Sequence, residues 1–465
     1  MTNYNRFLCV VLGPISFLLS YYLFPLEWFG SYSANGAVGT VIWMSIWWIT
    51  CPVDLAVTAF IPIAVNSIFQ IVDMNAVISN YSSETILLLL GASILTVSWE
   101  ETGLDKRVAA SLLSIVGGNL RIQIGLWFVL SCVMSSILPN AVVCATIIPI
   151  AVAMLKYVGV NDIGSSKNAS LILLTIVYAA GVGGLATPLG GAMNLITVKY
   201  IEELTGTEYM YIDCVRKFLH CLVFLVISNA LFLVLCCSPK DKIGGSKEYF
   251  VMQYKRLPKI TLEEKLVLAL FCFATILSFT RQFYSSYLPG LKPAYSFIIC
   301  AIVSFFITHK GGSRLLVWKR TQQKIVWELM YVFAGGLAVG CMINQSGAAS
   351  SLGKHIALLG ATGGFLTVLV ILLFTILLSD VTSNTATAAV AVPIVIAVAK
   401  GMGQDPIPYV YIATIGVNLS YILPTSIRSI PIGYGMKPSF MIKKGIPITL
   451  MMIMSLSVIC YLMYL

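Results

Sequence analysis

The chain has 465 residues, of which 58% are hydrophobic and only 10% are charged. Soluble domains carry roughly 25% charged residues, so this composition excludes an ordinary soluble fold and predicts an all-α polytopic membrane protein. The formal net charge is +10, but the basic stretches are short and bracketed by apolar segments, so we expect the lipid bilayer as a partner and no nucleic acid.

Apolar runs recur along the whole chain, and many reach the roughly 20 residues that a membrane-spanning helix needs. We predict about eleven or twelve membrane segments, some shorter than a full span. The runs lie at 7–25, 41–69, 85–98, 123–138, 169–187, 218–237, 265–280, 294–308, 326–342, 364–379, 408–423 and 445–465. The first run leads into Pro25 and Glu27 without a small-residue cleavage site, so we interpret it as a retained helix.

Cysteine and histidine give no sign of a cofactor. The 12 cysteines are scattered without a Cys-x-x-Cys pair, and the 3 histidines are His220, His309 and His355. We therefore expect no disulfide framework, zinc site or haem site.

Two loops concentrate the basic residues, and the positive-inside rule places both in the cytoplasm. The first contains Lys240, Lys242, Lys247, Lys255, Arg256 and Lys259, and the second contains Lys310, Arg314, Lys319, Arg320 and Lys324. The longest polar interruption, 238–262, is predicted to be a cytoplasmic linker that separates 1–237 from 263–465.

The two halves are related by a constant offset of 244 positions. The matched pairs are Gly91 and Gly335, Gly103 and Gly347, Ser135 and Ser379, Asn140 and Asn384, Ala145 and Ala389, Pro149 and Pro393, and Ile150 and Ile394. An asparagine and a Pro-Ile pair in register within apolar tracts predict an internal repeat of about five or six membrane segments. With a cytoplasmic linker and an odd number of crossings per half, the repeats are inverted, as in many secondary transporters; parallel repeats remain the alternative.

Each half contains a long apolar stretch with polar residues at its centre, at 123–158 around Asn140 and at 364–398 around Asn384. Each is long for one crossing, so we predict a re-entrant hairpin in each. A single buried asparagine can simply hydrogen-bond neighbouring helices. Two equivalent asparagines in two broken helices favour a binding site, where free carbonyls suit Na⁺ and helix N-termini suit an anion.

A second pair of breaks follows the hairpins, and we predict broken helices at about 170–195 and 408–435. Aligning Pro188 with Pro424 sets Gly190 against Ser426, Gly191 against Ile427 and Ala192 against Arg428. Glycines allow a ligand to approach the backbone closely. We expect the four breaks to converge on one site at the membrane midplane.

Three ionisable residues lie within or beside apolar runs, where charges are costly and usually functional or paired. Asp380 is either a counter-ion to a cation or, as we favour, a structural residue that stabilises the hairpin through a hydrogen bond or a salt bridge. Arg428 either attracts an anionic substrate or pairs with an acid such as Asp380 or reaches the membrane interface. Asp54 is interpreted as marking a helix end.

At these residues the chain resembles the divalent anion/sodium symporter family over nearly its whole length. The run from Ser383 to Thr387, ending in Pro393-Ile394, matches the family's hairpin-tip motif. Weaker matches are Val57-Thr58-Ala59 before Pro62, and Gly335-Gly336-Leu337-Ala338. The resemblance implies a homodimeric transporter of di- or tricarboxylates or sulfate, in which transport domains slide against a fixed scaffold.

The resemblance also implies two sodium sites flanking one substrate site. The first sodium site would use Ser135, Asn140 and Gly190, and the second would use Ser379, Ser383, Asn384 and Ser426. The substrate would contact Asn140, Ala141, Gly191, Asn384, Thr385 and the neighbourhood of Ile427, with Arg428 as the added cation.

The chain departs from the family motif at the first hairpin tip and in both loops that follow the tips. Pro139-Asn140-Ala141 stands where the family has Ser-Asn-Thr, which removes hydroxyls near the first sodium site. Arg428 adds a fixed cation, and a guanidinium can grip a carboxylate with two donors. Sodium symport and sodium-independent anion exchange are therefore both open.

We expect a secondary active transporter of small di- or tricarboxylates in the cell membrane, of bacterial inner-membrane type. The alternatives are a transporter of sulfate or another oxyanion, and a passive anion channel with Arg428 as its selectivity element. An intramembrane enzyme using Asp54 and Asp380 is disfavoured, because the two lie in different kinds of segment.

Overall fold

The computed structural model describes residues 3–113, 119–237, 242–309, 311–349, 351 and 363–465. Lys240, Lys310 and His355 lie outside these ranges. Within them the chain is helical apart from its connections and two isolated bridges, Asn119 to Lys242 and Thr308 to Arg314. The predicted all-α class is confirmed.

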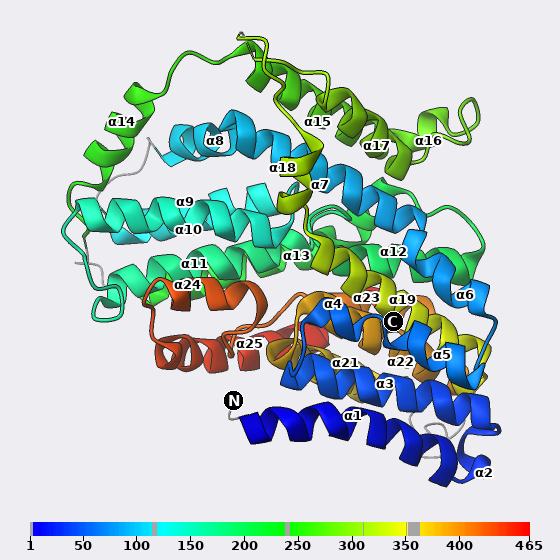
Figure 1. The fold of residues 1–465 in the computed structure, drawn as a ribbon. Coiled ribbons are helices and arrows are strands. Elements are labelled where there is room, and N and C mark those ends of the chain that lie inside the picture. Colours follow the sequence, from blue (N-terminus) through cyan, green and yellow to red (C-terminus); the bar gives the residue numbers. More distant parts are fainter. Residues whose placement is uncertain (1–2, 114–118, 238–241, 310, 350, 352–362) are drawn as a thin grey trace.

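Long helices dominate the structure, and short ones connect them (Figure 1). The long helices are α1 (Asn3–Leu23), α3 (Tyr32–Thr50), α7 (Glu84–Thr102), α9 (Leu120–Ser135), α10 (Asn140–Tyr157), α11 (Lys167–Gly184), α12 (Ala192–Thr205), α13 (Tyr211–Leu235), α15 (Leu262–Phe279), α17 (Pro293–Ser304), α19 (Trp327–Gln345), α21 (Phe365–Val381), α22 (Asn384–Gly401), α23 (Pro406–Val417) and α25 (Pro438–Tyr464). The short helices are α2 (Leu26–Phe29), α4 (Leu55–Thr58), α5 (Ile61–Phe69), α6 (Met74–Ile78), α8 (Leu104–Leu113), α14 (Ser246–Arg256), α16 (Arg281–Tyr284), α18 (Trp318–Lys324) and α24 (Ser429–Gly433), with 3-10 turns η1 (Ser79–Ser82) and η2 (Ser426–Arg428).

Among the described residues, 8 helices are long and apolar enough to cross a membrane, and shorter apolar helices of 10–17 residues accompany them. The shorter ones include α9 and α21, which fall in the two stretches predicted to be hairpins. Exposed apolar side chains such as Leu231, Leu235 and Leu462 cover α13 and α25, as expected for helices that face lipid. The multi-pass prediction is confirmed.

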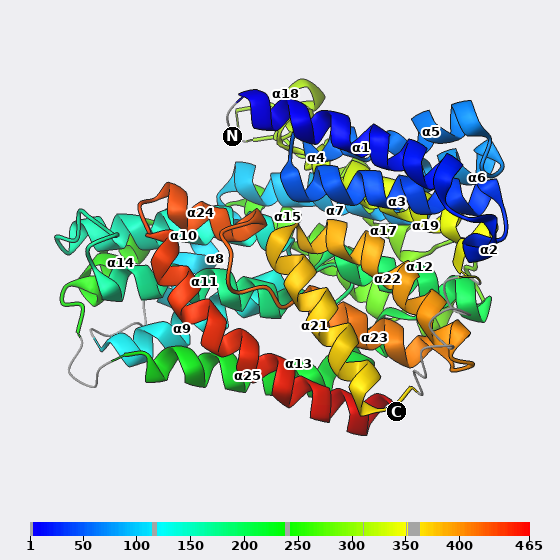
Figure 2. The same ribbon diagram turned by 90° about the horizontal axis from the view of Figure 1, so that it is seen from below.

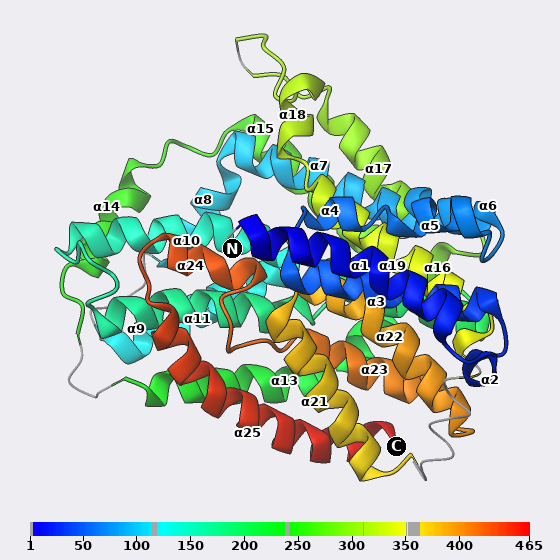
Figure 3. The same cartoon turned by 60° about the horizontal axis from the view of Figure 1, so that its bottom comes forward.

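The helices pack as neighbouring pairs. α1 runs along α3, α9 along α11, and α7 along α17 (Figure 1). Seen from below, α25 and α13 lie together on the side opposite α1 and α3 (Figure 2). In all views α9, α10 and α11 form one group, and α21, α22 and α23 form another on the other side of the molecule (Figure 3). The linker that was predicted from polarity alone contains α14 in its described part.

Helix bounds in the two halves follow the offset of the sequence repeat. α10 and α22 both have 18 residues and begin at the matched residues Asn140 and Asn384. α7 and α19 both have 19 residues and begin within one position of matched places. The orientation of the halves relative to each other stays a prediction, as do the boundaries of transport and scaffold domains.

The local sequence explains why α9 and α21 stop in mid-stretch. α22 is capped by Ser383, whose side chain accepts a hydrogen bond from the Ala386 N–H at 3.1 Å. At the matched place Pro139 precedes α10 and has no side-chain cap. Proline has no N–H and disfavours a helical conformation for the residue before it, so the helix cannot continue through this point.

Candidate binding cavity

A cavity of about 470 Å³ is lined by all four interrupted segments. One part of its wall comes from Pro139, Asn140, Ala141, Gly190, Ala192, Met193, Val381, Thr382, Ser383, Asn384, Thr385, Thr425, Ser426, Ile427 and Ile430. The other part comes from α3, α4, α19 and their flanks, with Trp48, Ile49, Cys51, Leu55, Val326, Glu328, Leu329 and Val332. The predicted breaks therefore do meet at one place.

The predicted site residues divide into two groups. Those on the cavity wall are Asn140, Ala141, Gly190, Ser383, Asn384, Thr385, Ser426 and Ile427. Ser135, Gly191, Ser379 and Arg428 are not among the residues that line it. Thr382 and Thr425 also line the cavity and were not predicted, although each adjoins a predicted break. The wall formed by α3, α4 and α19 was not predicted either, because no local sequence pattern in these helices indicates a site.

The cavity is suited to an anion because helices begin there. α10, α12 and α22 start at Asn140, Ala192 and Asn384, all of which line the cavity. The first N–H groups of a helix have no partner within the helix, and the N-terminus carries a partial positive charge. The positive ends of several helices therefore lie at the cavity wall, an arrangement that favours an anion there.

The side chain of Asn384 is oriented by two hydroxyl groups. Its Oδ1 atom accepts a hydrogen bond from Ser420 Oγ at 3.1 Å and lies 3.0 Å from Ser379 Oγ, which shares its single proton between this oxygen and the carbonyl of Val417. Because both hydroxyl groups lie against Oδ1, the Nδ2 group is the part of this side chain that remains for a ligand. Asn384 thus presents a hydrogen-bond donor to the cavity.

Ser135 and Ser379 play matching roles behind the wall. Ser135 Oγ donates to the carbonyl of Ala180 at 2.7 Å, and Ser379 Oγ donates to the carbonyl of Val417, also at 2.7 Å. Each hydroxyl ties the end of one helix of the predicted hairpin to the end of the broken helix behind it. Their carbonyl oxygens, rather than their hydroxyls, remain for other partners.

Arg428 is buried, with 2% of its surface exposed, and its guanidinium is satisfied entirely by the protein. Nε donates to Leu423 O at 2.8 Å, Nη1 to Ser420 O at 3.3 Å and to Ser420 Oγ, and Nη2 to Ser379 O at 3.1 Å and to Thr425 Oγ1. These contacts match the five N–H donors of a guanidinium. The structure therefore holds Arg428 behind the cavity wall, away from the position expected for a group that touches the substrate.

Asp380 braces the loop that carries Arg428. Its Oδ1 atom accepts hydrogen bonds from the N–H groups of Ile422 at 2.8 Å and Leu423 at 3.5 Å. Oδ2 is buried without a hydrogen-bond partner in the described structure. This geometry favours the bracing role over that of a counter-ion to a bound cation.

Oxygen atoms gather around Gly190 in the first half. A Cβ atom at Gly190 would lie 2.5 Å from Ser135 O and 3.0 Å from Gly184 O. At the neighbouring Gly184, the place of a Cβ lies 3.7 Å from Asn140 Nδ2 and 3.8 Å from Asn418 Oδ1, which is buried and has no hydrogen-bond partner among the described residues. Backbone carbonyl oxygens are ligands of the kind that coordinate Na⁺ in secondary transporters.

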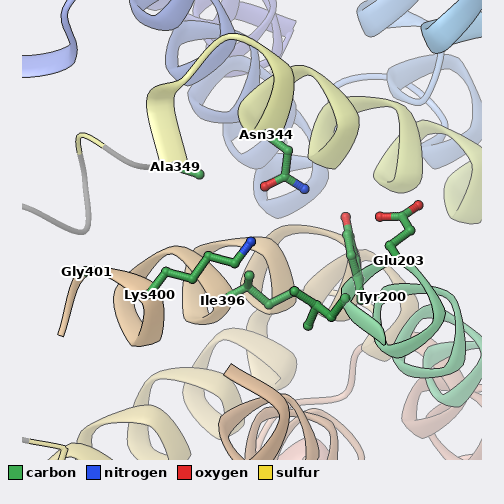
Figure 4. A pocket seen from close by; sticks show the side chains of 8 residues that line it. Tyr200, Glu203, Asn344, Ala349, Ile396, Lys400 and Gly401 are labelled. Atoms are coloured by element: carbon green, nitrogen blue, oxygen red, sulfur yellow. The ribbon is translucent and has the colours of Figure 1, made fainter. Parts of the chain in front are cut away.

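A second cavity, of about 480 Å³, lies at the other ends of α12, α19 and α22. Figure 4 shows Asn344 of α19 and Lys400 of α22 pointing toward the same space from opposite sides, with Glu203 and Tyr200 of α12 to the right of it. Its lining contains none of the predicted site residues. The cavity at the helix starts is therefore the better candidate for the binding site.

The sequence is similar to curated transporters over most of its length. The chain is 27% identical over 443 residues to the sodium-dependent dicarboxylate transporter SdcS of Staphylococcus saprophyticus, which covers 91% of this chain and 84% of the relative. It is 28% identical over 434 residues to the protein of the same name from Staphylococcus aureus, with 89% and 82% covered.

The fold is also found among solved structures. The crystal structure of the Alcanivorax borkumensis YdaH transporter matches with a TM-score of 0.53 and 13% identity, over 83% of this chain and 86% of that one. The family model described as citrate transporter matches residues 45–416. The chain therefore belongs to the citrate transporter family, in agreement with its resemblance to the divalent anion/sodium symporters, and is a multi-pass transporter of the cell membrane.

Proposed function

We propose that this chain is a secondary active transporter that moves small dicarboxylates together with sodium. The observation that carries the proposal is the shared cavity, where the N-termini of α10 and α22 and the Nδ2 group of Asn384 offer donors to an anion. Its volume of about 470 Å³ lies within the range of small-ligand sites. The names of the staphylococcal relatives support both the dicarboxylate and the sodium.

The sodium ion would bind in the oxygen cluster around Gly190. Ser135 O and Gly184 O lie beside Gly190, Asn418 Oδ1, which has no hydrogen-bond partner among the described residues, lies near Gly184, and Gly190 itself lines the cavity. A cation next to the cavity offsets part of the charge of a dicarboxylate, which makes binding of one favour binding of the other. The first sodium site, which has lost hydroxyls in the sequence, thus still has backbone oxygens.

Transport would follow an elevator-type movement in a homodimer. The groups α9–α11 and α21–α23 meet at the cavity from two sides, and α3, α4 and α19 form the remaining wall. Movement of α9–α11 and α21–α23 together against α3, α4 and α19 would carry a bound anion across the membrane without unfolding the site.

The experiment is uptake of labelled succinate into proteoliposomes with and without an inward sodium gradient, with citrate and sulfate as competitors. Sodium-driven accumulation is the expected result. Uptake that requires internal anion and ignores sodium would establish exchange instead, and flux without saturation or counterflow would establish a channel. Failure of all three anions to be transported would refute the substrate class.

Two asparagine variants separate the two cavities in the same assay. We expect Asn384→Ala to abolish succinate uptake, because it removes the oriented donor in the proposed site. Asn344→Ala changes the same residue type in the second cavity and should transport normally. The opposite result would move the substrate site to the second cavity.

A further inference from the structure

The loops after the two predicted hairpins have matching carbonyls held by different side chains. With Pro188 aligned to Pro424, Gly184 corresponds to Ser420 and Thr187 to Leu423. In the first half, Asn194 Nδ2 donates to Gly184 O at 2.7 Å and to Thr187 O at 2.8 Å. In the second half, the guanidinium of Arg428 donates to the two matching carbonyls, Ser420 O and Leu423 O.

Arg428 also donates to an oxygen atom whose counterpart in the first half receives no hydrogen bond from Asn194 within the described residues. Nη2 donates to Ser379 O at 3.1 Å, and Ser379 matches Ser135, whose carbonyl belongs to the oxygen cluster of the first half. In that half the residue matched to Arg428 is Ala192, which carries no donor. In the first half a neutral amide therefore holds only Gly184 O of the two cluster oxygens, whereas in the second half a cationic side chain holds both matching oxygens, Ser420 O and Ser379 O.

The acid that accompanies this cation is also confined to the second half. Asp380 lies at the position matched to Ser136, and its carboxylate braces the backbone of Ile422 beside the loop. A buried guanidinium and a buried carboxylate thus occur together in one half, and neither occurs at the matched positions of the other. This is what a permanently installed cation requires, because an isolated buried charge is costly.

The guanidinium also acts on the cavity through one hydroxyl. Arg428 Nη1 donates to Ser420 Oγ, which leaves the hydroxyl proton of Ser420 free to donate to Asn384 Oδ1 at 3.1 Å. This directs the Nδ2 group of Asn384 to the ligand. Gly184, at the matched place in the first half, has no hydroxyl to orient Asn140 in this way.

We infer that Arg428 is a built-in cation that occupies a second cation cluster of this transporter and positions Asn384 through Ser420, so that a single sodium ion accompanies each dicarboxylate. The inference rests on the proposed function for its transport readout. Beyond the proposed function, it states that one sodium ion is coupled to each dicarboxylate, and it assigns Arg428 a positioning role without substrate contact.

The decisive variant makes the second loop like the first. Arg428→Ala together with Ile430→Asn gives the positions matched to Ala192 and Asn194 the same residue types as the first half. The neutral amide introduced at position 430 can donate hydrogen bonds to Ser420 O and Leu423 O, and the cationic group is absent. We expect the wild type to show a Hill coefficient for sodium of about 1 and the double variant to approach about 2, because a second cluster becomes available to the ion.

A rescue experiment tests the same point without changing the loop twice. Arg428→Ala alone should lose at least about tenfold in succinate uptake, since several buried acceptors lose their donors. Guanidinium ion at low millimolar concentration should restore part of this uptake and raise the thermal stability of the variant, with no such effect on the wild type.

Arg281→Ala serves as the control, because Arg281 is also buried but pairs with Glu208 away from the cavity. The sodium dependence of this variant should stay that of the wild type.

Ser420→Ala tests the positioning step with the cation retained. We expect KM for succinate to rise about three- to tenfold, the range for loss of one hydrogen bond, with kcat and the Hill coefficient for sodium little changed. Ser457→Ala is the matched control, because Ser457 is buried in α25 and its hydroxyl donates to the carbonyl of Ile453 within that helix.

The outcomes separate this inference from the proposed function. A wild-type Hill coefficient near 2, an unchanged coefficient in an active double variant, or an unchanged KM in Ser420→Ala would overturn it. If the wild type transports none of the anions, the proposed function fails, and the thermal-shift arm decides the inference alone. Stabilisation of Arg428→Ala by guanidinium then supports the cation cluster, and its absence refutes it.

Discussion

The hydroxyl of Ser420 lies 3.1 Å from Oδ1 of Asn384 and donates a hydrogen bond to it. This contact joins the loop of the second broken helix to the N-terminus of α22. It determines which end of the Asn384 amide faces the cavity, and an amide that presents Nδ2 selects an anion over a cation.

The chemistry of Asn384 can be tested by an isosteric change. Asn384→Asp replaces the donor by a carboxylate that repels a dicarboxylate, and it also disturbs the contacts with Ser379 and Ser420. We expect kcat/KM for succinate to fall by about 100-fold or more, since losing a charge-assisted hydrogen bond and adding a like charge each cost a few kcal/mol. The measurement is initial uptake in proteoliposomes, with Asn344→Asp as the control, and near-normal uptake by Asn384→Asp would contradict the assigned orientation.

The oxygen cluster of the first half can be filled with a single methyl group. In Gly190→Ala the new Cβ would come within 2.5 Å of Ser135 O and 3.0 Å of Gly184 O, so it occupies the space proposed for sodium. We expect the concentration of sodium for half-maximal uptake to rise at least about tenfold, the effect of losing one good ligand interaction.

The control for this change is another glycine of the first half of the chain. A methyl group added at Gly125 in α9 would have no other side chain or loop of the described residues within 4 Å, so Gly125→Ala should transport and depend on sodium like the wild type. A normal sodium response in a folded Gly190→Ala protein would place the coupling ion elsewhere.

Asp105 provides a prediction on pH and stability. It lies in the first turn of α8, is 6% exposed, and its Oδ1 atom has no hydrogen-bond partner within the described ranges. Burial raises the pKa of the Asp105 carboxyl, an effect that the N–H of Lys106 partly offsets. The folded protein therefore binds this proton more tightly than the unfolded chain does.

The sign of the pH effect follows from this shift. The stabilising contribution of Asp105 is present below the unfolded pKa of about 3.9 and is lost as the pH rises through the higher folded pKa. Asp105→Asn removes the buried charge, so we expect it to be more stable than the wild type at pH 7 by about 1–2 kcal/mol. Thermal unfolding in detergent between pH 4.5 and 7.5 measures this, and an equal stability difference at both ends would show that the charge is not the cause.

The ion pair between Arg107 and Glu264 joins α8 to α15. Arg107 Nε lies 2.5 Å and Nη2 lies 3.0 Å from the two carboxylate oxygens, and the side chains are 17% and 5% exposed. Removing one partner leaves the other charge buried, so Arg107→Ala should destabilise the protein by about 3 kcal/mol. The pair of Lys199 and Glu203, 3.6 Å apart and 32% and 45% exposed, is the control, and Lys199→Ala should change stability by less than about 0.5 kcal/mol. Similar losses in both variants would refute the argument from burial.

Much of this protein was predictable from its sequence, because the patterns involved are local or periodic. Apolar runs predicted membrane helices since the bilayer requires about 20 apolar residues per crossing. The offset of 244 placed Asn140 and Asn384 at matching positions, and both begin 18-residue helices that meet at one cavity. Polar residues in apolar tracts indicated the breaks, because backbone without a helix needs partners at that depth.

The direction of the Arg428 side chain was decided by the tertiary structure alone. The sequence placed a cation beside the predicted substrate site, but Ser426 adopts a positive φ of 52° and begins a turn that brings Arg428 back toward Ser420 and Ser379. Such a turn depends on where the acceptors of α21 and the preceding loop lie, and these are 8 and 49 residues away from Arg428 in sequence.

The same reason explains the rest of the cavity wall. Trp48, Leu55 and Glu328 reach the site from α3, α4 and α19, through packing that no motif near them records. The sequence by itself determined the membrane class, the repeat and the polar breaks, because these follow from composition and spacing. Only the tertiary structure decided which groups face the ligand, because a side chain points to whichever partners the folded chain brings within hydrogen-bond reach.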